Sequence, residues 1–126
     1  MTTSSVQGGD RPVPRLLLAH GDPSLREGLG EMFGPASYDV DFAENLDEAL
    51  VVLGRGNVDI LVVNSRLPPK GCGALLERCH GPRPIIVIGE STDDVERIMA
   101  DRRVKSVLIR PFRLPALYDA VVRATN

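Results

Sequence analysis

The sequence predicts an α/β fold in which helices cover both faces of a doubly wound parallel sheet, and three observations support this prediction. Strand-length apolar runs alternate with helical patterns along the chain. The runs are nearly continuous in Leu, Val and Ile, which is typical of parallel strands buried on both faces. At 126 residues, the chain has room for one domain. We expect these strands at residues 16–19, 60–63, 85–88 and 107–109.

A fifth strand is expected over residues 38–43, where apolar and acidic side chains alternate. Such alternation indicates that one face of the strand contacts water. We therefore expect this strand at an edge of the sheet.

Five helices are expected between and after the strands, because apolar residues repeat there at three- and four-residue spacing. Asp22-Pro23-Ser24 is a plausible start for the first helix. Asn45 and Glu48 resemble a capping box at the start of the second, and Ser91 or Thr92 can cap the fourth. The expected inner faces are Leu25, Leu29, Met32 and Phe33; Leu46, Ala49, Leu50 and Leu53; Cys72, Leu75, Leu76 and Cys79; Val95, Ile98 and Met99; and Leu114, Leu117, Tyr118, Val121 and Val122.

The composition excludes several classes of protein. Fifteen basic and seventeen acidic side chains give a net charge of −2, which provides no basic surface for a nucleic-acid backbone. No apolar stretch approaches the ~20 residues of a membrane span. Residues 1–14 lack the features of a signal peptide, so we expect a disordered tail, a domain at 15–126 and a cytoplasmic location.

The residues that follow each apolar run are the candidate site, because ligands of open α/β sheets bind at the carboxyl ends of the strands. These residues are His20-Gly21-Asp22, Asn64-Ser65-Arg66, Gly89-Glu90-Ser91 and Arg110-Pro111.

Five segments in this order resemble the CheY-like receiver domain of bacterial response regulators. They are LLLAHGDPSLREGL, YDVDFAENLDEAL, DILVVNSRLPPKG, PIIVIGEST and VLIRPFRLPAL. The likeness runs from about Arg15 to Ala124. It implies a flavodoxin-like, three-layer α/β/α fold with strand order 2-1-3-4-5. The basic-Pro step of the family has a cis peptide bond, and Arg110-Pro111 is the matching step here.

In that family an aspartate after the third strand accepts a phosphoryl group, and two acidic residues after the first strand help to hold Mg²⁺. A Thr or Ser after the fourth strand and a Lys after the fifth bind the phosphoryl oxygens. An aromatic residue on the fifth strand takes part in switching. The matching positions here are Asn64 for the acceptor, His20 and Gly21 for the acidic pair, Gly89 for the hydroxyl, Arg110 for the lysine and Val107 for the aromatic residue.

These departures predict a degenerate phosphorylation site. The amide of Asn64 is a poor nucleophile and cannot form an acyl phosphate. Gly21 has no side chain, so Asp22 is the remaining acid near the site, and one carboxylate should not hold Mg²⁺ alone. Gly89 lacks the hydroxyl, and the planar fork of Arg110 does not replace a compact ammonium. We therefore expect no catalytic residue, no enzyme activity, no metal and no cofactor.

Two side chains of this region leave alternatives open. Arg110 either pairs with Asp22, bonds the Asn64 amide or points into solvent. His20 is more simply structural than a zinc ligand, although an imidazole could also sense pH. Cys72 and Cys79 match no common zinc pattern, lie roughly 10 Å apart along a helix and are expected to pack as small hydrophobic residues.

The fourth helix, fifth strand and fifth helix form the usual output face of receivers, and we take this face as the candidate interaction surface. Basic and acidic side chains here could orient a protein partner. The same face could form a homodimer. Its candidate residues are Asp94, Arg97, Asp101, Arg102, Arg103, Lys105, Val107 and Tyr118.

The leading hypothesis is a phosphorylation-independent pseudo-receiver that acts as a protein–protein interaction module in two-component-type signalling. It would contact protein partners, without direct nucleic-acid or membrane binding. The alternatives are a ligand- or pH-responsive regulatory domain and the receiver-like N-terminal part of a longer response regulator. A receiver that still accepts phosphate is disfavoured by Asn64.

Overall fold

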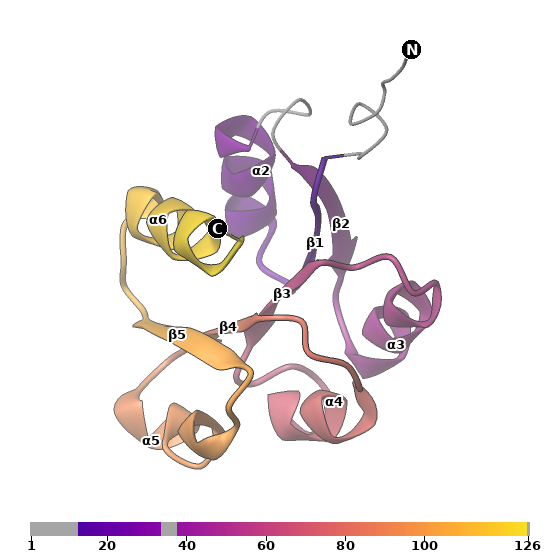
Figure 1. Ribbon diagram of the computed structural model, residues 1–126. Coiled ribbons are helices and arrows are strands. Elements are labelled where there is room, and N and C mark those ends of the chain that lie inside the picture. The colour runs from indigo at the N-terminus through magenta and orange to yellow at the C-terminus, as the bar shows by residue number, and fades with distance from the viewer. Residues whose placement is uncertain (1–12, 34–37, 126) are drawn as a thin grey trace.

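The computed structural model describes residues 13–33 and 38–125, and shows helices on both sides of a parallel sheet (Figure 1). The predicted tail lies outside the described residues up to position 12. Its last residue, Pro14, accepts a 2.9 Å hydrogen bond from the Asp39 N–H. In chain order the elements are β1 (Arg15–Ala19), α2 (Pro23–Met32), β2 (Asp39–Ala43), α3 (Leu46–Gly54), β3 (Ile60–Asn64), α4 (Cys72–Arg78), β4 (Ile85–Gly89), α5 (Thr92–Val95), the 3₁₀ turn η1 (Ile98–Ala100), β5 (Val104–Ile109) and α6 (Leu114–Thr125).

The five strands form one parallel sheet in the order β2-β1-β3-β4-β5, as predicted. Strand β2 is at an edge, which confirms the prediction from its alternating pattern. The central strands β1, β3 and β4 are almost entirely buried, in keeping with their continuous apolar sequences.

Two hydrophobic clusters pack on opposite faces of this sheet. Successive strand residues point to opposite faces, so Leu16 and Leu18 belong to one cluster and Leu17 belongs to the other. Helices α2 and α6 cover the first face, while α3, α4 and α5 cover the second (Figure 1). The three-layer α/β/α architecture is therefore confirmed.

The side-chain caps of two helices explain where they begin. The Asn45 Oδ1 accepts from the Glu48 N–H at 2.9 Å, as expected for a capping box. The Glu48 carboxylate reaches back to the N–H of Glu44, one residue earlier than the standard pattern. The Asp22 Oδ1 accepts from the Ser24 N–H at 2.9 Å and begins α2, which has Pro23 in its first turn.

The fourth expected helix is shorter than its apolar pattern implies, and one of its three predicted inner residues, Met99, is not buried. Helix α5 has four residues and no side-chain cap from Ser91, and the chain continues into the three-residue turn η1. Val95 is buried and Ile98 is partly buried, but Met99 is 61% exposed. Because the α-helix ends at Val95, Met99 does not lie one α-helical turn further along the same face.

Candidate functional site

The carboxyl ends of four strands bring the predicted site residues to one edge of the sheet. His20 directly follows β1, Asn64 ends β3, Gly89 ends β4 and Arg110 directly follows β5. The peptide bond between Arg110 and Pro111 is cis. This edge is the expected position of a functional crevice in a doubly wound fold.

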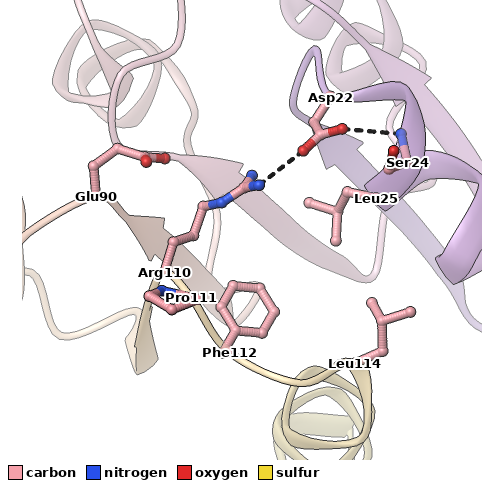
Figure 2. Close-up of a pocket in the computed structure, with 8 residues that line it drawn as sticks. All are labelled: Asp22, Ser24, Leu25, Glu90, Arg110, Pro111, Phe112 and Leu114. Carbon is pink, nitrogen blue, oxygen red and sulfur yellow. Dashed lines mark hydrogen bonds and ion pairs between the residues drawn. The ribbon is translucent and has the colours of Figure 1, made fainter.

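Arg110 pairs with Asp22 across the crevice, which confirms one of the predicted alternatives. The Nη2 of Arg110 lies 2.9 Å from the Oδ2 of Asp22, so the β5–α6 loop is connected to the start of α2 (Figure 2). The hydrogen bond from Arg110 is the main reason that the pKa of Asp22 lies below its ordinary value. The Asn64 amide is used locally, since its Oδ1 accepts from the Arg66 N–H at 3.1 Å.

His20 is 4% exposed and lies against the same ion pair. Its Nδ1 accepts from the Asp22 N–H at 3.1 Å, and its Nε2 lies 3.5 Å from the Arg110 Nη1. Burial is the main cause that lowers the pKa of His20, and the Arg110 charge lowers it further. The geometry therefore favours a neutral imidazole that carries its proton on Nε2.

The described residues contain no group of His, Cys, Asp or Glu side chains arranged to hold a metal ion. Cys72 and Cys79 are buried and unlinked. Burial raises the pKa of Cys72 to about 11, so its thiol stays protonated at neutral pH. Both thiols lie in the hydrophobic cluster under α3 and α4, as predicted, and the Cys79 Sγ also accepts from the Arg83 Nη1 at 2.9 Å.

The space around Gly89 is filled by two apolar side chains. A Cβ atom at this position would lie 2.6 Å from Val95 Cγ1 and 3.2 Å from Ile109 Cδ1. Such distances are shorter than van der Waals contact, so a serine or threonine would not fit without movement. Gly21 differs, because a Cβ atom there would meet nothing within 4 Å.

A pocket of about 520 Å³ opens beside the ion pair (Figure 2). One side is polar, and the opposite side is formed by apolar residues of α2, the β5–α6 loop and α6. Sequence reasoning missed the apolar side, although Phe112 directly follows the Arg110-Pro111 step that it singled out. The lining residues are Asp22, Ser24, Leu25, Glu90, Arg110, Pro111, Phe112 and Leu114.

The predicted interaction residues do not share one environment. Arg97, Arg102 and Lys105 are exposed, and Val107 is partly exposed on β5. Tyr118 instead stacks on Phe33, with ring centroids 5.0 Å apart, between α6 and the end of α2. The side chain of Asp94 lies outside the described part of the chain.

Asp101 and Arg103 of the predicted face are engaged with each other and with α4. The Arg103 Nη2 lies 2.7 Å from the Asp101 Oδ2 and donates to the Leu76 carbonyl at 2.9 Å. Its Nη1 donates to the Cys79 carbonyl. These contacts place Arg103 at the C-terminal end of α4, where a cation is favoured by the helix dipole.

Several solved structures share this architecture. A non-phosphorylated HemR receiver domain from Leptospira biflexa has a TM-score of 0.78 and 24% identity, and the match covers 90% of this chain and 94% of that chain. The signal receiver domain of an HD domain-containing protein from Pseudomonas fluorescens has a TM-score of 0.78 and 21% identity over 89% of this chain and 94% of that chain. This chain has the receiver fold.

A third receiver-fold structure, a CheY-like response regulator receiver domain protein from Methanospirillum hungatei, has a TM-score of 0.77 and 16% identity over 88% of this chain and 92% of that chain. No family model matches the chain. The transcriptional activator protein PfeR of Pseudomonas aeruginosa is 31% identical over 118 residues, which is 89% of this chain. The match spans 39% of PfeR, so the chain corresponds to well under half of that relative's length.

Proposed function

We propose that this receiver fold is a pseudo-receiver: a phosphorylation-independent protein–protein interaction module of two-component-type bacterial signalling, acting in the cytoplasm. The observation that carries the proposal is the 2.9 Å pair between Arg110 and Asp22. The degenerate site consists of His20, Gly21, Asp22, Asn64, Gly89 and Arg110. Asp22 is its one carboxylate, and the guanidinium of Arg110 already neutralises it.

The residues present do not fit the Mg²⁺ ion that receivers of this fold use. Magnesium is held by carboxylates together with phosphate oxygens and water. Here a cation of the protein itself contacts Asp22, while Asn64 contributes a neutral oxygen that already accepts from Arg66. We therefore derive no phosphoryl-transfer step for this chain.

The filled space at Gly89 supports loss of the switch as well as loss of the chemistry. In the family, a hydroxyl at this position binds the phosphoryl group and moves with it. Val95 and Ile109 lie where that side chain would begin. A fixed packing arrangement at the end of β4 is consistent with a domain that presents one constant surface.

An NMR titration of backbone amides tests this proposal directly. Mg²⁺ is added first and beryllofluoride, a mimic of a phosphoryl group on a carboxylate, is added second. We expect no saturable shifts at His20, Asn64 or Arg110. Saturable shifts that extend to Val107 would contradict the proposal, because they would show that ligand-driven switching survives.

The interaction role needs a separate test on the exposed cations of the α5–β5 face. The immobilised domain is compared with Arg97→Glu and Arg102→Glu for the proteins that it retains from a cell extract. Both positions are exposed, so their reversal should weaken partner retention while the fold persists. Arg78→Glu, at an exposed position on α4, is the control. Equal retention by all variants would exclude this face as the docking surface.

A ligand-responsive role is the second candidate, and the pocket beside Arg110 favours it. Its volume of about 520 Å³ lies in the range of small-molecule sites, and its lining is mostly apolar with a few polar groups. A metabolite that raises the melting temperature of the wild-type chain, but not of Phe112→Ala, would support this role.

The name of the relative, a transcriptional activator, favours a pathway that ends in transcription.

A further inference from the structure

The outer edge of β5 is one of the two open sides of the sheet. Strands β1, β3 and β4 are almost entirely buried, whereas every described residue of β5 is at least partly exposed, and Lys105 is exposed. Within the described ranges, no strand pairs with the side of β5 that faces away from β4. Figure 1 shows this edge between α5 and α6.

The segment that flanks this edge on the α5 side is short. Helix α5 spans four residues and η1 three, and Met99 of η1 is 61% exposed. Two adjoining hollows, of about 260 Å³ and 380 Å³, lie along the strand and share Lys105 and Ser106. The first is lined by Met99, Val104, Lys105, Ser106 and Val107, and the second by Lys105, Ser106, Arg123 and Ala124.

The backbone of β5 directs hydrogen-bonding groups toward this groove. The Arg110 N–H donates to the Gly89 carbonyl of β4 at 2.9 Å. In a parallel ladder alternate residues face opposite neighbours, so the N–H groups of Val107 and Ile109 face the outer side. These groups are the ones that an added strand would use.

The positive charge of the groove favours a partner segment that carries acidic side chains. Lys105 and Arg123 line the two hollows, and no carboxylate is among the described residues that line them. Lys105 is also the extra residue where the register between β4 and β5 shifts, since Ile85 pairs with Val104 and Ile86 pairs with Ser106. A lysine and a bulge protect an edge strand against unselective pairing.

We propose that the outer edge of β5, from Ser106 to Ile109, binds an extended segment of a partner protein as a sixth strand, and that carboxylates of this segment pair with Lys105 and Arg123. This inference rests on the proposed interaction role and specifies how the partner binds. Main-chain hydrogen bonds supply affinity in this mode, and side-chain pockets supply selectivity. Apolar side chains of the segment would contact Met99 and Val107.

A second copy of this chain fits the groove less well, because it would bring the same two cations to the same place. Like charges across an interface oppose association. Sedimentation of the wild-type domain measures this alternative, and self-association through β5 would overturn the choice of an acidic partner.

The test uses a synthetic peptide of alternating glutamate and valine, with amide exchange and chemical shifts of the labelled full chain as readouts. We expect the peptide to slow exchange at Val107 and Ile109 and to shift the signals of Met99. A lysine–valine peptide should not bind. An N-methylated glutamate–valine peptide, which cannot donate to the strand, should lose binding while it keeps its charge.

Lys105→Glu should weaken binding about tenfold, whereas Lys70→Glu, at an exposed position in the β3–α4 loop, should leave it unchanged. Equal binding of the N-methylated peptide, or no protection at Val107 and Ile109, overturns strand addition. If the domain still retains a partner through Arg97 and Arg102 in that case, the interaction role stands and only the binding mode fails.

Discussion

At the scale of single residues, the crevice is organised around one guanidinium. Arg110 contacts Asp22 and lies beside His20, and the Asp22 N–H in turn donates to the His20 ring. Asp22 therefore contacts both the guanidinium of the β5–α6 loop and the imidazole of its own loop. Because each contact depends on a particular protonation state, this group also determines how the domain responds to acid.

Removal of the guanidinium should change the conformation of the two loops, with only a small decrease in the free energy of unfolding. Both partners are partly exposed, with side-chain exposures of 37% for Arg110 and 24% for Asp22. Such a pair is worth about 0–1 kcal/mol in the free energy of unfolding. We therefore expect Arg110→Ala to shift the amides of Asp22 and Ser24 with a small change in urea midpoint. Arg113→Ala, at an exposed position nearby, should change neither, and equal effects of both variants would contradict a specific role for Arg110.

Acidification should destabilise the domain through His20. Its pKa is lower in the folded chain than the 6.5 of an unfolded histidine, so below pH 6.5 the unfolded chain binds more protons. Stability should fall as the pH decreases from 6.5 through the folded pKa, and show no contribution from this group above 6.5. Urea unfolding as a function of pH measures this. His20→Gln should flatten the dependence, while His80→Gln, at an exposed site, should keep it.

A side chain at position 89 should destabilise the domain by overpacking. The Cβ atom of Gly89→Ser would lie 2.6 Å from Val95 Cγ1. We expect a loss of about 1–3 kcal/mol, measured by chemical unfolding. In a chain that already carries Val95→Ala, Gly89→Ser should lower the free energy of unfolding by less than it does in the wild-type chain. Additive effects in that double-mutant cycle would show that Val95 is not the obstacle.

At the scale of elements, the C-terminal end of α4 depends on two arginines from outside the helix. Arg103 bonds the carbonyls of Leu76 and Cys79, and Arg83 bonds the His80 carbonyl. Cations at this end satisfy carbonyls that the helix leaves unpaired. The adjacent Arg102 and Arg103 therefore differ in role, since Arg102 is exposed and Arg103 is structural.

This difference predicts unequal effects of two adjacent substitutions. Arg103→Ala removes the ion pair with Asp101 and the hydrogen bonds to the carbonyls of Leu76 and Cys79 at the end of α4, and should cost about 2 kcal/mol in the free energy of unfolding. Arg102→Ala should change stability by less than about 0.5 kcal/mol. Thermal unfolding measures the melting temperatures of both variants. Similar melting temperatures would contradict the structural role of Arg103.

At the scale of the whole molecule, the sequence predicts the fold well, but it predicts less of the packing around the site. Continuous and alternating apolar patterns predict the buried strands and the edge position of β2, since burial on one or two faces determines those patterns. The sequence also predicts which residues lie together in the crevice, because they follow the carboxyl ends of the strands. The contact of Val95 with Gly89, the pocket beside Phe112 and the role of Arg103 depend on packing between segments distant in sequence, and no local spacing encodes such packing.

Added carboxylates should restore Mg²⁺ binding to this crevice without restoring the switch of a receiver. Gly21 has open space for a side chain, so Gly21→Asp together with Asn64→Asp should add two carboxylates without overpacking the crevice. Together with Asp22, these should make Mg²⁺ binding saturable in an NMR titration. The shifts should nevertheless stop short of Val107, because Val95 still fills the space at Gly89. Gly21→Asn alone, which matches the size without the charge, should bind no Mg²⁺. Shifts that reach Val107 in the double variant would show that the switch needs only carboxylates. In that case, the packing of Val95 against Gly89 is not what holds the domain in one state.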